Sequence, residues 1–240
     1  MRIIMLSWEY PPKIVGGIAR HVYELGHALA EEDIEVHVIT AEFPGAPAYE
    51  RQHDLLHVHR VAVTEHANDF VHWVQLLNRS MQAKAEELLN GWQQEGKPFK
   101  SRAFADGVLL HAHDWLAHYS GAYLKHTYRL PLIATIHATE YGRNNGLHND
   151  LQRYIASVEW QLSYEAWRVI CCSWYMKGEV EFALQTPSDK IVVIPNGVDT
   201  TKFEFKFDEA ERQAFRSNYA APDEKILFFV GRMVREKGAH

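Results

Sequence analysis

The predicted fold rests on the stretch RIIMLSWEYPPKIVGGIARHVYEL, residues 2–25, in which an apolar run, two prolines, a glycine pair and a helical pattern follow one another. The apolar run predicts a buried strand, and the prolines, which cannot extend a strand's hydrogen bonding, predict that a loop begins there. Apolar residues at helical spacing come next: Ile18, Val22, Leu25 and Leu29. Gly16 and Gly17 stand where that helix begins. An approachable backbone with unpaired N–H groups suits a phosphate there, although a tight turn without a ligand explains the same glycines.

Strand and helix patterns alternate through most of the chain. Apolar or alternating runs predict strands over residues 34–40, 56–63, 108–113, 132–136, 168–172 and 191–194. Helical spacing predicts helices over residues 70–92, 116–128, 151–162 and 174–184. Several strands are apolar on both faces, which is typical of a parallel sheet covered by helices on both sides. The predicted fold class is α/β, a Rossmann-like parallel sheet, with a polar loop over residues 138–149.

The composition changes after Asp199. Residues 209–219 have the pattern of a surface helix, and residues 225–230 form a new apolar run that ends at a glycine and an arginine. This run predicts the first strand of a second α/β domain that the sequence cuts short. We therefore expect residues 1–200 to form the Rossmann-like domain, and residues 201–240 to form a linker and the start of the second domain.

Length, charge and composition argue against several classes of protein. A net charge of −6 over 240 residues argues against a general nucleic-acid binder. No apolar run approaches the roughly 20 residues that span a bilayer, and the N-terminus lacks the pattern of a signal peptide. The two cysteines, Cys171 and Cys172, are adjacent, so they are poor disulfide partners and too few for a zinc site. We expect them in the core of a cytoplasmic protein without a transmembrane segment.

Polar residues stand where several predicted strands end. Asp114, His137 and Asn196 each follow a strand at its carboxyl end. Ligands of parallel α/β sheets bind outside those ends, so these residues and the Gly16–Gly17 loop are candidates for one site. Structural roles are the alternatives, because Asp114 could cap a helix and His137 could hydrogen-bond a neighbouring loop.

Two His-x-His pairs, His57 with His59 and His111 with His113, each place two rings on one face of a predicted strand, as two metal ligands would lie. No spare cysteine and no clustered carboxylate accompanies either pair. Ordinary polar or half-buried histidines are therefore the preferred interpretation, and we expect no metal.

Arg232 and Lys237 lie across a predicted strand-to-helix turn. A guanidinium can fork onto a diphosphate while an ammonium acts as a point charge. Considered alone, each residue has the features of an ordinary surface charge.

Five segments in order resemble the retaining glycosyltransferases of the two-Rossmann-domain (GT-B) type, in the group that contains bacterial and archaeal glycogen and starch synthases. They are Trp8–Pro12 with the glycine pair, His111–Trp115, Thr135–His137, Pro195–Asp199 and Gly231–Gly238. The resemblance covers essentially the whole chain. It implies a cleft between two domains, with a nucleotide sugar mainly on the second and an acceptor on the first.

The resemblance also implies roles for residues of the first domain. Gly16 and Gly17 would place N–H groups against the donor diphosphate. Asp114 and His137 would line the sugar site as the catalytic pair.

For the donor, the resemblance implies that Asn196 lies near the sugar and that Arg232 and Lys237 neutralise the leaving nucleoside diphosphate. Such enzymes need no divalent metal, and no cofactor is expected here. The implied partners are ADP- or UDP-glucose and a glucan or other sugar acceptor.

Two departures from the synthase pattern widen the choice of function. The synthases have a lysine two residues before the first glycine, whereas Lys13 lies three before Gly16, which favours the broader family 4 of glycosyltransferases. The acidic Glu-x7-Glu pair and most of the nucleotide pocket would lie beyond His240, so the base is not predicted and this chain alone is expected to transfer no sugar. The alternatives are a family 4 transferase with a lipid or small-sugar acceptor, and a non-catalytic module that binds sugar or nucleotide.

Overall fold

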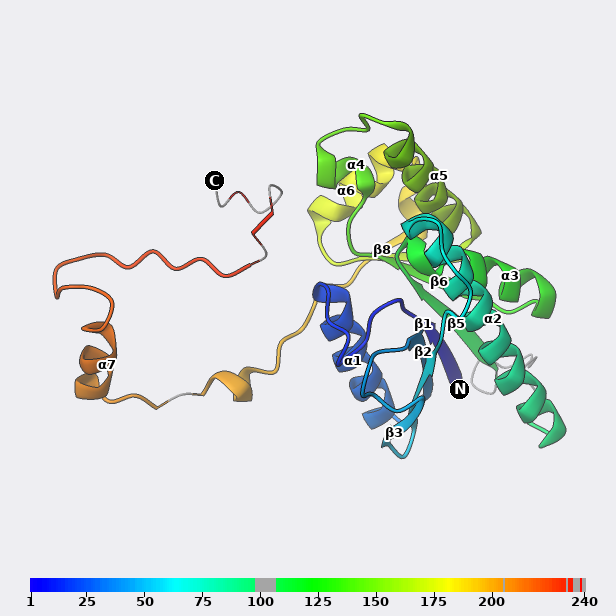
Figure 1. The fold of residues 1–240 in the computed structure, drawn as a ribbon, viewed down its shortest axis with the longest axis horizontal. Helices are drawn as coiled ribbons and strands as arrows, with labels where there is room; N and C mark the ends of the chain where they lie inside the picture. The colour runs from blue at the N-terminus through cyan, green and yellow to red at the C-terminus, as the bar shows by residue number, and fades with distance from the viewer. Residues whose placement is uncertain (98–106, 205, 232, 235–237, 239–240) are drawn as a thin grey trace. The chain divides into compact units, whose positions relative to one another are not determined.

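A computed structural model describes the chain at residues 1–97, 107–204, 206–231, 233–234 and 238. The chain divides into two compact units, Met1–Pro195 and Asn196–His240 (Figure 1). The division falls close to the predicted boundary after residue 200. That the second unit begins a nucleotide-binding domain stays a prediction.

The first unit is built on an eight-stranded sheet with the order β3-β4-β2-β1-β5-β6-β7-β8. All neighbouring strands pair in parallel except β3, which runs antiparallel to β4 at one edge. The strands are β1 (Arg2–Leu6), β2 (Glu35–Ala41), β3 (Tyr49–His53), β4 (Leu56–Val61), β5 (Val108–His113), β6 (Leu132–Ile136), β7 (Arg168–Cys171) and β8 (Ile191–Val193). The helices of this unit are α1 (Gly17–Glu31), α2 (Phe70–Gln94), α3 (His118–Tyr128), α4 (Glu140–Asn144), α5 (Asp150–Glu165) and α6 (Trp174–Ala183).

Successive side chains of each strand face opposite helical layers, as the pleat requires. In β1, Ile3 and Met5 pack in a core cluster with α1, whereas Ile4 and Leu6 pack in a larger cluster with α2 and α3 (Figure 1). This two-sided burial confirms the predicted α/β class and explains why the strands are apolar on both faces. Cys171 lies in the larger cluster as a buried free thiol.

Two elements of the first unit were not predicted. The sequence of β3, YERQH, is polar because β3 is an edge strand whose side chains are largely exposed, so it lacks an apolar signal. The helix α4 lies inside the predicted polar loop and has only five residues. Its N-cap is Thr139, whose hydroxyl accepts the N–H of Gly142 at 2.9 Å.

The second unit contains a 3-10 helix, Thr200–Phe203, and the predicted surface helix as α7 (Glu209–Arg216). Asp208 and Glu211 form a capping box at its start. Residues 225–230 form no strand here, since no part of the chain that the structure describes pairs with them, and their place as the first strand of a second domain stays a prediction. An apolar run becomes a strand only where a neighbour takes up its backbone hydrogen bonds. None of the described helices is both long and apolar enough to cross a membrane.

Candidate active site at the carboxyl edge of the sheet

The strands β1, β5 and β6 are neighbours in the sheet and run parallel, so their carboxyl ends bring three loops to one edge. The loop after β1 contains Gly16, Asp114 follows β5, and His137 follows β6. The candidate residues of the first unit therefore share the edge at which parallel sheets bind ligands.

Asp114 holds the turn after β6. Its Oδ1 accepts the backbone N–H of His137 at 2.7 Å, and the N–H of Ala138 lies against the same carboxylate. Asp114 has a φ of 57° and a ψ of 175°, a backbone conformation that lies outside the left-handed helical region and that residues with a side chain rarely adopt. The alternative that Asp114 caps the following 3-10 helix, Trp115–Ala117, is wrong, because its side chain makes no capping bond.

The carboxyl group of Asp114 is almost fully buried, and its Oδ2 accepts no hydrogen bond from the described residues. The nearest cation is the guanidinium of Arg143 in α4, whose Nη2 lies 3.8 Å from Oδ2. Burial raises the pKa of Asp114 to about 6, against the lowering effect of the His137 N–H and of Arg143. Asp114 is therefore largely ionised at neutral pH and acts on the backbone of the neighbouring loop.

His137 points its ring toward two other histidines on the α1 side of the sheet. Its Nε2 lies 3.2 Å from Nδ1 of His113, and its ring meets the ring of His21 edge-on at 4.8 Å between centroids. Burial and the charge of Arg143 lower the pKa of His137 to about 4. The ring is therefore neutral at neutral pH, and with Nε2 engaged by His113 its Nδ1 is the atom left for a ligand.

His21, His113 and His137 offer ligand atoms that lie within 4.8 Å of one another, so they could hold a metal ion. No carboxylate belongs to this group. Nδ1 of His113 lies 3.2 Å from Nε2 of His137, and the neighbouring His111 bonds the hydroxyl of Thr135 at 2.7 Å, whereas the buried Nε2 of His113 makes no hydrogen bond with the described residues. The expectation that no metal is needed at this edge stays a prediction.

The loop after β1 is held by Glu9, a residue that the sequence analysis did not single out. Glu9 is 1% exposed, and its Oε2 accepts the N–H groups of Val15 at 2.6 Å and Gly16 at 2.9 Å. The Gly16 N–H, expected to face a diphosphate, is thus bonded to a carboxylate in this structure. Gly17 is the first residue of α1, and a Cβ there would meet no atom within 4 Å. The packing of this unit therefore leaves the backbone of Gly17 open to close approach.

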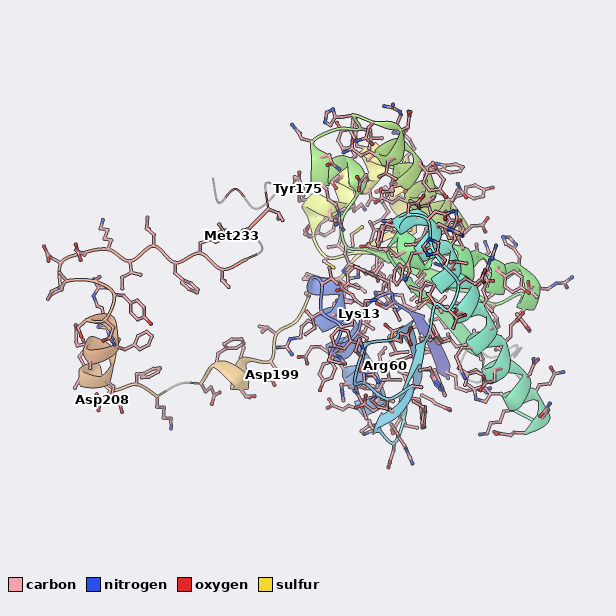
Figure 2. All side chains as sticks on the ribbon, in the orientation of Figure 1. Lys13, Arg60, Tyr175, Asp199, Asp208 and Met233 are labelled. Carbon is pink, nitrogen blue, oxygen red and sulfur yellow. The ribbon has the colours of Figure 1, made fainter. Side chains whose placement is uncertain are left out.

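Two basic side chains support the same loop (Figure 2). Lys13 lies over the rings of Trp73 at 4.7 Å and Trp8 at 5.6 Å, and burial lowers its pKa. Arg60 of β4 is buried, and its Nη2 donates to the carbonyl oxygen of Pro11 at 2.9 Å. Lys13, whose spacing departs from that of the synthases, thus packs its ammonium group against two aromatic rings.

Glu159 of α5 is a third buried carboxylate near this edge. Its two oxygens lie 2.9 and 3.0 Å from the N–H of Glu140, the first residue of α4. Burial raises the pKa of Glu159 to about 8. The sequence carried no signal for this role, because α5 contributes the carboxylate from 19 residues away along the chain.

Three candidates do not belong to the first unit. Asn196 is the first residue of the second unit. Arg232 and Lys237 lie outside the described residues. Their parts in donor binding stay predictions.

Comparisons with known proteins agree with this architecture. The family model for glycosyltransferase family 4 matches residues 15–202. The sequence is 36% identical over 243 residues to an uncharacterized glycosyltransferase of Methanocaldococcus jannaschii, covering 99% of this chain and 57% of that protein. It is 32% identical over 251 residues to a glycogen synthase of Mycobacterium tuberculosis, covering 100% of this chain and 56% of that protein. The chain thus spans about half the length of these curated relatives.

Solved structures of the GT-B type show the same fold. A sucrose-phosphate synthase of Thermosynechococcus elongatus superposes with a TM-score of 0.69 at 19% identity, covering 98% of this chain and 56% of that one. The catalytic domain of starch synthase IV of Arabidopsis thaliana superposes with a TM-score of 0.60 at 16% identity, covering 93% and 60%. With a family model that matches most of its length, the chain belongs to glycosyltransferase family 4.

Proposed function

We propose that the full-length protein transfers glucose from ADP- or UDP-glucose to a glucan with retention of the anomeric configuration. The support is the relation to a glycogen synthase at 32% identity and the fold shared with a starch synthase whose crystals contain ADP and acarbose. The donor would bind between this unit and a nucleotide-binding domain that follows it. The location in the cytoplasm belongs to the same proposal.

The observation that carries the proposal is the bond from the His137 N–H to the buried Asp114. It fixes the turn after β6 at the ligand edge of the sheet. Retaining transfer builds positive charge on the donor sugar ring, and groups held rigidly in place stabilise that charge without reorganisation. In our proposal the carbonyl oxygen of His137 faces this charge, and its neutral ring bonds a sugar hydroxyl through Nδ1.

The diphosphate requires positive groups at the other end of the donor. Gly17, with its open backbone at the start of α1, is the better candidate from the glycine pair, because the Gly16 N–H is bonded to Glu9. Asn196, Arg232 and Lys237 would complete the donor site from the second domain. In this scheme charge on the leaving group is carried by side chains and a helix end rather than by a metal.

Transfer is tested by incubating the full-length protein with UDP- or ADP-glucose and glycogen. We expect glucose incorporation at rates typical of enzymes, about 1 per second or more, and an α-linked product by NMR. Omission of glycogen is the control that separates transfer from hydrolysis of the donor. A β-linked product, or no incorporation from either donor, would contradict the proposal.

A second candidate is a family 4 transferase with a smaller acceptor. It is favoured by relatives at 26% identity that are named alpha-maltose-1-phosphate synthase and D-inositol 3-phosphate glycosyltransferase. Replacing glycogen by glucose 1-phosphate or inositol 3-phosphate in the same assay distinguishes the two candidates. A protein that binds nucleotide sugar but transfers to none of these acceptors would favour a binding module.

A further inference from the structure

A second group of histidines lies on the opposite face of the sheet from His113 and His137. Glu35 and His37 are two residues apart on β2, and His57 is the register partner of His37 on β4. All three side chains therefore project to the same face, and there the ring of His37 meets the ring of Trp92 from α2 at 4.9 Å. Their ligand atoms, one from each residue, lie within 4.8 Å of one another.

We propose that Glu35, His37 and His57 bind one zinc ion that ties β2 to β4. Two imidazole nitrogens and one carboxylate oxygen form a ligand set that zinc uses in proteins, with water in the fourth position. Softer metals favour thiolates, and magnesium and calcium favour oxygen ligands, so this mixed set fits zinc better than either class.

The distances in the cluster are close to those of a bound site. Oε1 of Glu35 lies 3.0 Å from Nε2 of His37, and two ligands at about 2.0–2.2 Å from a tetrahedral zinc lie roughly 3.3 Å apart. The two ligand atoms that are farthest apart are separated by at most 4.8 Å, so they must approach each other by up to about 1.5 Å. The strand register already sets the backbones side by side, and the shift turns the two histidine rings out of their stacked arrangement, 4.6 Å between centroids.

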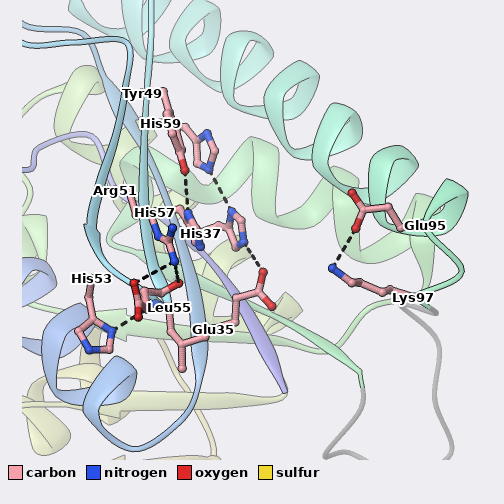
Figure 3. A network of polar contacts seen from close by, with 11 residues as sticks. Glu35, His37, Tyr49, Arg51, His53, Leu55, His57, His59, Glu95 and Lys97 are labelled. Atoms are coloured by element: carbon pink, nitrogen blue, oxygen red, sulfur yellow. Dashed lines mark hydrogen bonds and ion pairs between the residues drawn. The ribbon is translucent and has the colours of Figure 1, made fainter.

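Neighbouring side chains orient the two rings as partners of metal-bound histidines do. Nδ1 of His57 lies 2.9 Å from the hydroxyl of Tyr49 on β3, which leaves Nε2 as the atom that binds an ion. Nδ1 of His37 lies 3.0 Å from Nε2 of His59, which leaves Nε2 of His37 next to Glu35 (Figure 3). Each ligand histidine thus has its second nitrogen engaged, which fixes its tautomer and its orientation.

The competing explanation is a hydrogen-bonded cluster without an ion. In that explanation, the contact between the Glu35 carboxylate and the His37 imidazole needs no ion. The strand register and the stacking of the His57 ring on the His37 ring, 4.6 Å between centroids, place His57 without an ion as well. A zinc ion would bring the ligand atoms of all three side chains to one centre, so metal binding distinguishes the two explanations.

The cluster is separate from the candidate active site. Glu35 is the first residue of β2 and Ala41 the last, and six residues of strand span about 20 Å. The proposed ion therefore lies toward the amino end of the strands and on the face covered by α2. Its expected role is to stabilise the edge formed by β2, β4 and β3 rather than to take part in transfer.

Zinc binding is tested on purified protein without a histidine tag, stripped with EDTA and then dialysed against zinc chloride. We expect one zinc per chain by elemental analysis. At zinc concentrations about 100 times the Kd, we expect a rise of roughly 5–10 °C in the melting temperature. His57→Gln should weaken zinc affinity by at least about 100-fold, and Tyr49→Phe by about tenfold, because Tyr49 only orients a ligand.

Two variants serve as controls. His66→Gln removes an exposed histidine outside the cluster and should leave affinity unchanged. His137→Ala tests the other histidine group and should also leave affinity unchanged. Circular dichroism of His57→Gln distinguishes loss of a ligand from loss of the fold. If His57→Gln does not fold, the tenfold loss of affinity expected for Tyr49→Phe still tests the proposal. Zinc that binds His57→Gln as tightly as wild type, zinc lost in His137→Ala instead, or no zinc at all would overturn the proposal.

Discussion

The loop after β1 and the loop after β6 leave the same edge of the sheet, and each is held by a buried carboxylate that accepts backbone hydrogen bonds. They differ in where the carboxylate comes from. Glu9 belongs to the loop that it holds, and its partners Val15 and Gly16 are six and seven residues away. Asp114 follows the neighbouring strand, β5, and its partner His137 is 23 residues away.

Glu9 thus acts within its own loop, whereas Asp114 fixes the position of a loop that follows a different strand. The loop after β1 has an anchor of its own in Glu9 as well as the contacts of Pro11 with Arg60 and of Lys13 with an aromatic ring, so it keeps other supports when one is removed. The turn after β6 depends on another strand for its place at the edge. We therefore expect the second loop to be the more sensitive of the two, although both lie at the candidate site.

The largest effect is expected from Asp114→Ala. Without the carboxylate, the turn at His137 loses its anchor, and a displacement of about 1 Å at a reacting group can lower a rate by about 100-fold. We expect kcat of the full-length enzyme to fall at least that much, with the change measured under saturating donor and glycogen. A fall of less than about threefold would mean that Asp114 does not position the loop.

The next effect concerns pH and the third carboxylate, Glu159. Because burial raises its pKa in the folded state to about 8, its contribution to stability is full below about pH 4.5 and is lost as the pH rises through about 8. The free energy of unfolding should therefore fall by up to about 1.4 kcal/mol per pH unit within that window. Glu159→Gln keeps an acceptor for the Glu140 N–H and should flatten this fall.

Urea denaturation at about pH 5 and about pH 8 measures the difference. Glu87→Gln is the control, because Glu87 is an exposed carboxylate of α2. An equally steep fall in wild type and in Glu159→Gln would contradict the assignment.

The smallest effect is expected from Glu9→Ala. Two N–H groups lose their carboxylate, but Arg60 and the aromatic contacts of Lys13 still hold the loop, so we expect a loss of about 1–3 kcal/mol in stability. The kcat should fall by about tenfold or less. A loss of activity as large as that of Asp114→Ala would remove the distinction between the two loops.

The chain's alternating pattern predicted the parallel strands of the sheet and most of its helices, because burial on both faces leaves a continuous apolar signal in those strands. The rule that parallel strands carry sites at their carboxyl ends was enough to select Asp114 and His137. This rule did not predict the hydrogen bond from the His137 N–H to Asp114. Helix capping, the local role considered for Asp114, is absent.

Residues that act through partners distant along the chain carried no such signal. Glu9 and Glu159 are ordinary carboxylates until folding brings backbone N–H groups to them. His57 was considered only with His59, because its relation to Glu35 and His37 depends on the register between β2 and β4. The run at residues 225–230 has the pattern of a strand, but the described chain offers it no partner, so its role in a second domain stays a prediction.

The central claim is that the turn after β6 holds the reacting sugar, and His137→Ala in the full-length protein tests it most directly. The variant removes the ring contact to a sugar hydroxyl and loosens the adjoining carbonyl. A hydrogen bond of that kind contributes about 1–3 kcal/mol, so we predict a fall in kcat of about tenfold to 100-fold. The Kd of UDP or ADP should change little, because in this account the nucleotide is held by Arg232 and Lys237. An unchanged kcat, or a loss confined to nucleotide binding, would show that His137 is a structural residue and that the sugar lies elsewhere.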